Sequence, residues 1–219
     1  MGEAARRALD VEVARAARAF QALDEVGGEG GAAQLDDTNY AYLCDPRLVD
    51  VFKQWGYDPK EIPGRSAKLI NDSIAQRPAG MTIGIHLCRG NSSGQWAAQG
   101  GYEPIAEHLL NELNVDGYFL EYDDVRSGGF EPLRFFPKGS KKRVVLGLVS
   151  TKNPVVESKD DIRRRIDEAA KFVPLENLCL SPQCGFASTW KGNPITPEVQ
   201  RKKLETVVQV ATDVWGSAK

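Results

Sequence analysis

Five short apolar segments, separated by longer amphipathic ones, are the feature that most constrains how this chain of 219 residues can fold. Continuous apolar runs of this length are typical of strands that are buried on both faces of a sheet. The predicted strands cover residues 32–35, 81–88, 117–122, 143–149 and 177–181. Because helices separate most of them, the sequence predicts right-handed βαβ units that form a parallel sheet with helices outside it. The predicted fold class is therefore α/β.

The helices are predicted from apolar residues that recur every three or four positions, which gives each helix one buried face. The predicted helices cover residues 5–23, 46–55, 66–75, 104–113 and 158–172, and a last one begins at Thr196. Ser158 is a typical N-cap residue, and Asp160 and Asp161 favour the first turn that follows it. In the irregular segment 128–142, the run FEPLRFF predicts a short helix. Residues 1–219 contain no internal repeat and are predicted to form a single domain.

Charge and composition exclude several classes of partner. The formal net charge is −2, and acidic and basic residues are mixed along the chain, so no basic patch for nucleic acid is expected. No apolar run approaches the roughly 20 residues that span a bilayer, so no membrane segment is expected. The start of the chain does not resemble a secretory signal, which predicts a cytoplasmic protein. In that compartment the four cysteines are expected to be thiols or metal ligands rather than disulfides.

Chemically reactive side chains follow three of the predicted strands, at the point where each strand ends. His86 and Cys88 are two positions apart, so the alternation of a strand places them on the same face. Glu121 ends the next strand, and Cys184 lies just beyond the last one. Because the carboxyl ends of parallel strands meet at one edge of a sheet, these four side chains are predicted to converge.

An imidazole, two thiolates and a carboxylate form a donor set that suits tetrahedral Zn²⁺. Structural zinc sites usually contain more cysteine in close CxxC pairs, whereas these donors are spread along residues 86–184 and include a displaceable oxygen. The pattern therefore favours a catalytic zinc site. The alternative is a packed histidine beside an inert buried cysteine, with Glu121 as a solvated charge. Cys44 and Cys179 have no matching pattern and are predicted to be structural.

Four motifs carry a resemblance to a known family. They are HLCRGN at residues 86–91, the acid of YFLEYDD at Glu121, SPQCGF around Cys184 and AQLDD at residues 33–37. They resemble the zinc motifs and the IQIDE strand of the catalytic domain of cobalamin-independent methionine synthase, in the UROD/MetE-like superfamily, and along the chain they occur in the family's order. The likeness is strongest to the stand-alone MetE-like proteins, and it extends from the first predicted helix to the last.

The resemblance implies a zinc-dependent methyltransferase. It implies that His86, Cys88, Glu121 and Cys184 bind one zinc ion per chain, which holds a small-molecule thiol substrate as its reactive thiolate. Glu121 is expected to be the ligand that the substrate sulfur displaces. Asp36 matches the family aspartate that binds the amino group of homocysteine. The expected methyl donor is 5-methyltetrahydrofolate and the expected product is methionine.

The sequence departs from the family pattern in two places. The family has a histidine in the strand aligned with residues 145–150, where this chain continues as LVSTK at residues 148–152. No proton donor is therefore assigned, and Lys152 and Glu157 are candidates by position only. The first barrel strands of the family would precede Met1, and the family's IGS-type segment, which binds the substrate carboxylate and contributes to folate binding, is absent.

Five strands, rather than the eight of a closed (β/α)₈ barrel, predict a partial TIM barrel that corresponds to the C-terminal part of the family's barrel. Its two unpaired sheet edges favour association, either as an oligomer or with a partner chain that completes the barrel. The chain is thus expected to be a truncated paralogue, a fragment of a longer product or one part of an assembly.

Three functional hypotheses stay open. The favoured one is methyl transfer to homocysteine, and its variant is alkylation of another thiol, since the zinc ligands alone do not distinguish the two substrates. The second is a non-catalytic zinc-binding paralogue that has lost the donor-binding half. The third is a plain α/β domain without a metal.

Overall fold

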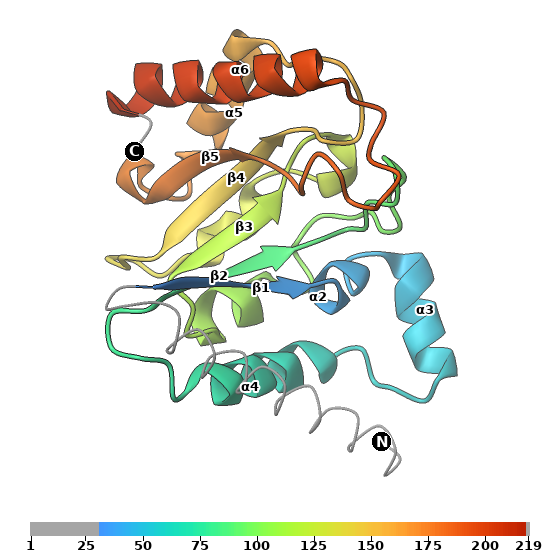
Figure 1. Ribbon diagram of the computed structural model, residues 1–219. Helices are drawn as coiled ribbons and strands as arrows, with labels where there is room; N and C mark the ends of the chain where they lie inside the picture. The colour runs from blue at the N-terminus through green and yellow to red at the C-terminus, as the bar shows by residue number, and fades with distance from the viewer. Residues whose placement is uncertain (1–30, 218–219) are drawn as a thin grey trace.

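The computed structural model describes residues 31–217, and a parallel sheet of five strands forms their centre (Figure 1). The strands are β1 (Ala32–Asp37), β2 (Thr82–Leu87), β3 (Gly117–Glu121), β4 (Arg143–Val149) and β5 (Leu178–Pro182). They lie side by side in chain order, and all neighbours are parallel. The five predicted strands and the α/β class are confirmed. Within the described residues the sheet is open, with β1 and β5 at its edges, as expected for part of a barrel.

Helices pack along the sheet near both of its edge strands (Figure 1). The α-helices are α2 (Asn39–Tyr42), α3 (Pro46–Gln54), α4 (Ile62–Ile74), α5 (Lys159–Ala169) and α6 (Pro197–Trp215). The shorter helical turns are the π-helix η1 (His108–Glu112) and the 3₁₀-helices η2 (Val125–Ser127), η3 (Glu131–Phe135) and η4 (Leu175–Asn177). In Figure 1, α5 and α6 lie beside β4 and β5, whereas α4 lies on the other side of the molecule, below β1 and β2.

Most of the helix predictions are confirmed, with shifted ends. The helix expected to begin at residue 66 begins at Ile62, because Pro63 occupies its first turn, where a missing N–H costs nothing. The Ser158 side chain caps α5 as predicted, and it accepts a hydrogen bond from the backbone N–H of Asp161. The helix expected over residues 104–113 is mainly the π-helix η1, and FEPLRFF forms η3. The helix predicted over residues 5–23 lies outside the described residues.

The two faces of the sheet have different surroundings. One set of alternating side chains packs under the helices and forms the hydrophobic core; it includes Ile83, Ile85, Leu87, Tyr118, Leu120, Val144, Leu146 and Leu148. Each fully buried aliphatic side chain of this kind contributes about 1.5–3 kcal/mol to folding. The other face carries a row formed by Asp36, His86 and Phe119, which are register partners on β1, β2 and β3. This row leads to the carboxyl end of the sheet.

A glycine allows the Phe119 ring to lie against β2. A Cβ atom at Gly84 would stand 2.7 Å from Cε2 of Phe119, so only glycine leaves room for the ring at this position. The ring therefore lies against the strand that carries His86, on the same face as that imidazole.

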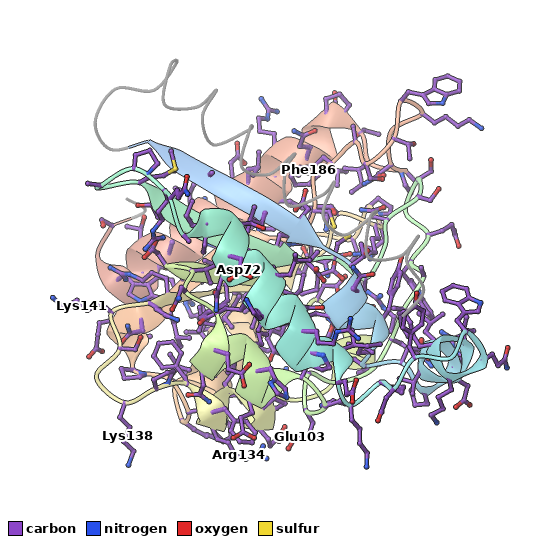
Figure 2. All side chains as sticks on the ribbon, turned by 90° about the horizontal axis from the view of Figure 1, so that it is seen from below. Asp72, Glu103, Arg134, Lys138, Lys141 and Phe186 are labelled. Atoms are coloured by element: carbon purple, nitrogen blue, oxygen red, sulfur yellow. The ribbon has the colours of Figure 1, made fainter. Side chains whose placement is uncertain are left out.

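Acidic and basic side chains both lie on the outer surface. Lys138 and Lys141, in the segment between η3 and β4, are exposed and project away from the body of the molecule (Figure 2). In the described part of the chain, no helix combines the length and the apolar character that crossing a membrane requires.

Candidate metal centre

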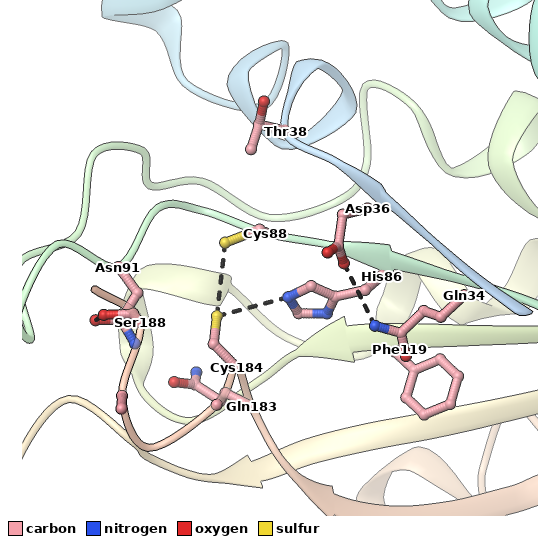
Figure 3. A pocket seen from close by; sticks show the side chains of 12 residues that line it. Gln34, Asp36, Thr38, His86, Cys88, Asn91, Phe119, Gln183, Cys184 and Ser188 are labelled. Carbon is pink, nitrogen blue, oxygen red and sulfur yellow. Dashed lines mark hydrogen bonds between the residues drawn. The ribbon is translucent and has the colours of Figure 1, made fainter. Parts of the chain in front are cut away.

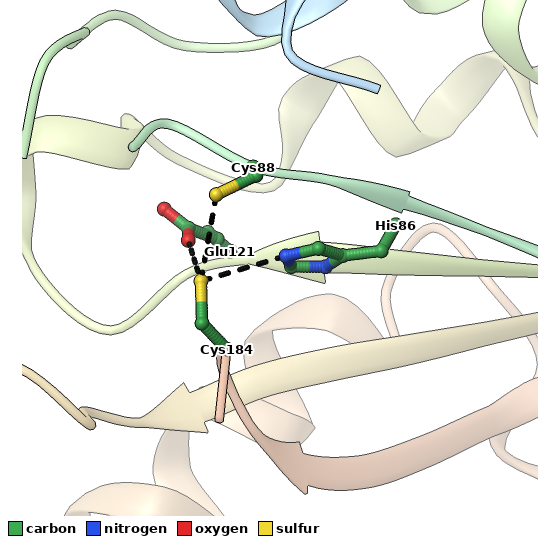
Figure 4. A group of neighbouring side chains, drawn as sticks. All are labelled: His86, Cys88, Glu121 and Cys184. Atoms are coloured by element: carbon green, nitrogen blue, oxygen red, sulfur yellow. Dashed lines mark hydrogen bonds between the residues drawn. The ribbon is translucent and has the colours of Figure 1, made fainter. Parts of the chain in front are cut away.

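Four side chains from three strand ends converge on one point. His86 lies on β2, Cys88 directly follows that strand, Glu121 ends β3, and Cys184 follows β5. One ligand atom from each of them lies within 4.8 Å of the others. As Figure 4 shows, Cys184 occupies the middle of the group: its Sγ lies 3.5 Å from Cys88 Sγ, 3.5 Å from His86 Nε2 and 3.2 Å from Glu121 Oε1. The structure thus brings together all four side chains that the sequence analysis singled out as metal ligands.

The spacing and the surroundings of this group fit a tetrahedral ion. Two sulfurs bound to zinc at about 2.3 Å lie about 3.8 Å apart at the tetrahedral angle, which is close to the 3.5 Å between the two cysteine sulfurs. Glu121 is fully buried, and its Oε2 has no hydrogen-bond partner among residues 31–217. Lys152 Nζ lies 3.4 Å from the other oxygen, Oε1, so the cost of burial falls on Oε2, which is satisfied only if a proton or a cation reaches it. A cation therefore matches both the donor set and the electrostatics.

The two cysteines of the group differ in acidity from the two outside it. The hydrogen bond with Cys184 lowers the pKa of the Cys88 thiol to about 5, and His86 supports this shift. The same hydrogen bond, together with burial, raises the pKa of Cys184. One thiolate is thus favoured even before a metal binds.

Cys44 and Cys179, in contrast, are made less acidic by burial. Burial raises the pKa of Cys44 to about 12 and also raises the pKa of Cys179. Cys44 donates a weak hydrogen bond to the Tyr40 carbonyl, with a sulfur–oxygen distance of 3.5 Å. Neither cysteine belongs to the group of potential ligands.

Burial and nearby negative charge have opposite effects on the pKa of His86. Burial by itself would lower the pKa of the imidazole, but the hydrogen bond to Cys88 and the charges of the neighbouring acids outweigh it and raise the pKa. Metal binding requires the neutral ring and therefore releases a proton from any protonated imidazole.

The main chain of Glu121 is held by two buried residues that the sequence analysis missed. The Tyr102 hydroxyl accepts a hydrogen bond from the Glu121 N–H (2.9 Å) and donates one to the Glu121 carbonyl (3.3 Å). Arg89, which is fully buried, donates from Nη1 to both the Tyr102 hydroxyl (2.6 Å) and the Glu121 carbonyl (3.1 Å). Its Nη2 donates to the Gly100 carbonyl at 2.6 Å. Arg89 and Tyr102 therefore fix the position from which the Glu121 carboxylate projects.

The sequence contained only half of the signal for this pair. Arg89 directly follows Cys88 in the HLCRGN motif, so its place beside the site was predictable. Tyr102 lies in a loop, and its contact with Glu121 arises from tertiary packing alone.

The two candidate proton donors have different surroundings. Lys152 Nζ lies 3.4 Å from Glu121 Oε1 and 2.6 Å from Gln183 Oε1, so it reaches the ligand group. The Glu157 carboxylate accepts a hydrogen bond from the Ser150 N–H at 2.8 Å and pairs with Lys203. Glu157 therefore anchors the loop after β4, whereas Lys152 lies beside the potential ligands.

An open cavity of about 410 Å³ lies beside the potential ligands (Figure 3). His86, Cys88 and Cys184 line one part of it, and Asp36 and Phe119 line another. Asp36 is the register partner of His86 on the neighbouring strand. The aspartate predicted to bind substrate thus faces the same cavity as three of the four potential ligands.

Asp37, the next residue along β1, has a local structural role. Its Oδ1 accepts a hydrogen bond from the Tyr40 N–H at 2.8 Å, in the turn that leads into α2. Burial raises the pKa of the Asp37 carboxyl. Alternation along the strand thus separates the roles of the two adjacent aspartates.

Three loops meet above the cavity through Asn91. The Asn91 side chain accepts hydrogen bonds from the Gly94 N–H (3.0 Å) and the Ser188 hydroxyl (3.1 Å), and it donates one to the Thr151 hydroxyl (3.3 Å). These contacts join the loops that follow β2, β4 and β5. The last residue of the HLCRGN motif therefore fixes the rim of the site.

Comparison with known proteins places the chain in a family. Residues 65–213 match the family model described as the catalytic domain of cobalamin-independent synthase. The uncharacterized protein YxjH of Bacillus subtilis is 51% identical over 182 residues, which are 83% of this chain and 48% of that protein. A methionine synthase of Pyrococcus furiosus is 29% identical over 71% of this chain and 39% of its own length. The chain thus spans about half the length, or less, of these curated relatives.

Two solved structures have the same fold. A protein of Listeria monocytogenes, provisionally assigned as a vitamin-B12-independent methionine synthase, matches 97% of this chain and 57% of its own chain, with a TM-score of 0.74 and 38% identity. A B12-independent methionine synthase of Shewanella sp. W3-18-1, solved in complex with selenomethionine, covers 91% of this chain and 52% of its own, with a TM-score of 0.63 and 18% identity. The family match and the closer of these two structures lead to one conclusion: the chain belongs to the family of the cobalamin-independent methionine synthase catalytic domain.

Proposed function

We propose that this chain binds one zinc ion through His86, Cys88, Glu121 and Cys184 and serves in the transfer of a methyl group to a thiol. The observation that supports the proposal most directly is the convergence of the four ligand atoms within 4.8 Å, at the carboxyl end of a parallel sheet. Sites in folds of this class assemble at that end. Zinc bound there supplies Lewis acidity, which keeps a substrate thiol in its nucleophilic thiolate form at neutral pH.

The side chains around the ligands suit an amino-acid thiol such as homocysteine. Asp36 faces the cavity beside His86 and offers a carboxylate to the ammonium group of the substrate. Phe119 provides an apolar wall on the same face of the sheet, against which the methylene groups of the substrate can pack. Glu121 is proposed to be the ligand that the thiol displaces. Arg89 and Tyr102 hold its main chain, so only its side chain needs to move.

The methyl donor is proposed from the family. Resemblance to the cobalamin-independent methionine synthases supports 5-methyltetrahydrofolate as the donor and methionine as the product. The thiolate would attack the methyl carbon in line, so the new S–C bond forms as the N5–C bond breaks and the folate nitrogen takes up a proton.

Zinc analysis of the purified protein is the first test of the proposal. We expect one zinc per chain, and we expect Cys88→Ser and Cys184→Ser to lower zinc affinity sharply, because each removes a thiolate ligand. Cys44→Ser and Cys179→Ser are matched controls and should bind zinc like the unchanged protein. Equal zinc retention in all four variants would refute the ligand assignment.

A methyl-transfer assay tests the activity itself. The purified chain is incubated with zinc, 5-methyltetrahydrofolate and homocysteine, with and without the portion of YxjH that the chain does not match, and methionine is measured. We expect the Asp36→Asn variant to lose its preference for homocysteine over the analogue without the amino group. Zinc binding without turnover in every combination, including other thiols, would instead support a non-catalytic zinc-binding role.

The open sheet edges make association a second testable expectation. Strands β1 and β5 lie at the edges of the sheet that the described residues form, and unpaired edges favour pairing with another chain. We propose that an oligomer or a partner segment completes the barrel. Light scattering at several protein concentrations, alone and with the unmatched portion of YxjH, measures this association, and a monomer in all samples would contradict it.

A further inference from the structure

The potential ligand set carries more negative charge than a zinc ion removes. When they bind metal, Cys88, Cys184 and Glu121 are anions and His86 is neutral, so the four ligands contribute three negative charges to two positive ones. The surplus negative charge lies in a site where Glu121 is fully buried, and uncompensated charge in such surroundings is costly. A further cation beside the ligands is therefore expected, and the structure contains one.

Lys152 supplies this cation, and it approaches the oxygen of Glu121 that faces the metal site. The Lys152 side chain is 6% exposed, and its Nζ lies 3.4 Å from Glu121 Oε1. The same Oε1 lies 3.2 Å from the Sγ of Cys184, and this sulfur occupies the centre of the ligand group (Figure 4). A metal ion held through Oε1 would therefore share that oxygen with the ammonium group, and the two would compete for its electron pairs.

The position of Lys152 is fixed by contacts with the rest of the fold. Its Nζ donates to Gln183 Oε1 at 2.6 Å, and Gln183 directly precedes Cys184. The Thr151 carbonyl next to Lys152 accepts a hydrogen bond from Asn193 Nδ2 at 2.8 Å. Gln183 thus holds the ammonium group of Lys152, and Asn193 holds the main chain beside it.

Glu157 and Lys203 hold the two ends of the loop that carries Lys152. The Ser150 N–H donates to Glu157 Oε1 at 2.8 Å, and Lys203 of α6, which is fully buried, pairs with Glu157 Oε2 at 3.0 Å. Lys203 Nζ also donates to the Val155 carbonyl. This ion pair, in which the lysine is fully buried and the glutamate is half-buried, holds both ends of that loop.

We propose that Lys152 makes Glu121 the exchangeable ligand of the metal site. This inference rests on the proposed function. Lys152 weakens the bond between Glu121 and zinc by sharing Oε1, and it keeps the carboxylate paired after a substrate thiol takes its place. In that exchange a metal–sulfur bond would replace the metal–oxygen bond, and the thiol proton would leave to solvent. Without Lys152, the displaced Glu121 would be a bare buried anion, and the exchange would be unfavourable.

The experiment compares Lys152→Met with the unchanged protein in two binding measurements. Zinc affinity is measured by competition with a chromophoric chelator, and homocysteine binding to the zinc-loaded protein is measured by calorimetry. Because the ammonium no longer competes for Glu121, we expect zinc to bind on the order of tenfold more tightly. Because a displaced Glu121 would then be an unpaired buried anion, we expect homocysteine to bind on the order of tenfold more weakly. Lys138→Met is the matched control, since it removes the same charge from an exposed site, and it should change neither value.

A double-mutant cycle separates this role from a merely structural one. If Lys152 acts through Glu121, the effect of Lys152→Met on zinc affinity should vanish when Glu121 is replaced by Gln, because the shared anion is gone. Lys152→Arg keeps the charge and should retain both affinities. If Lys152→Met fails to fold, Lys152→Gln replaces it, since the shorter amide can still bond with Gln183 and removes only the charge.

The outcomes distinguish this inference from the proposed function. If the unchanged protein binds zinc and homocysteine but Lys152→Met leaves both affinities unaltered, the inference is wrong and the proposed function stands. An equal effect of Lys152→Met with and without Glu121 would also overturn it. If the unchanged protein binds no zinc, the proposed function fails, and the role assigned to Lys152 fails with it.

Discussion

Removal of a single oxygen atom from Tyr102 tests whether the main chain of Glu121 is held as the structure indicates. The Tyr102 hydroxyl is buried and has three partners: the Glu121 N–H at 2.9 Å, the Glu121 carbonyl at 3.3 Å and Arg89 Nη1 at 2.6 Å. The Tyr102→Phe variant keeps the ring, which packs against Tyr122 with ring centroids 5.2 Å apart. The perturbation is therefore confined to hydrogen bonds.

The expected cost follows from counting these bonds. The Glu121 N–H loses its side-chain acceptor in a buried place, which costs about 1–3 kcal/mol. Arg89 Nη1 loses one of its two acceptors but keeps the Glu121 carbonyl at 3.1 Å, so a charged hydrogen bond is weakened by about 1–2 kcal/mol. We expect Tyr102→Phe to lower the free energy of unfolding by about 3 kcal/mol in total.

Tyr40→Phe is the matched control. Tyr40 is also fully buried, but its hydroxyl donates to a single acceptor, the Pro63 carbonyl at 2.9 Å. Loss of one neutral hydrogen bond costs about 1 kcal/mol, so the two variants should differ by about 2 kcal/mol.

Urea unfolding of the metal-free protein, followed by circular dichroism, measures both variants. A chelator excludes any contribution from metal binding, and unchanged m-values show that the transitions are comparable. If Tyr102→Phe is no more destabilising than Tyr40→Phe, the Tyr102 hydroxyl does not hold Glu121, and our account of the ligand's support is wrong.

Two further predictions concern the framework around the site. Gly100 has a φ of +119°, and a Cβ atom there would stand 2.0 Å from the Cys44 carbonyl oxygen, so Gly100→Ala should cost more than about 3 kcal/mol in urea unfolding. Gly139→Ala, at a φ of +71° with open space around it, should cost only about 1 kcal/mol, and equal costs would contradict the steric argument. Asp45 caps α3, and its hydrogen bonds with Arg47 lower its carboxyl pKa to about 2. Its contribution is therefore fully present above the unfolded pKa near 4 and is lost as pH falls towards 2. Asp45→Asn should lower the free energy of unfolding at pH 7 by about 1–2 kcal/mol, and this deficit should shrink below pH 4; a deficit independent of pH would exclude the ionic explanation.

The local part of the fold followed directly from the sequence. Short apolar runs predicted the five strands, because a strand buried on both faces has no polar alternation. The period of two along a strand placed His86 and Cys88 on one face, and the parallel arrangement placed Glu121 at the same end of the sheet. These conclusions needed no knowledge of distant contacts, since they depend on backbone geometry alone.

Other features were decided only by tertiary structure. The position of Cys184 just after the last strand predicted its edge of the sheet, but only the fold shows that its Sγ lies 3.2 Å from Glu121 Oε1 and 3.5 Å from His86 Nε2. Lys152 and Glu157 looked alike as charged residues in one loop, yet the first reaches Glu121 and the second pairs with Lys203. Tyr102 gave no signal at all.

The physical reason is the difference between local and long-range geometry. A side chain's direction relative to its own strand is fixed by the two dihedral angles of its residue, which sequence patterns reflect. Which distant groups it meets depends on strand register and on the paths of loops, and both are set by the packing of the whole molecule. The sequence therefore determined which residues could bind a metal, and the tertiary structure decided which neighbours hold and balance them.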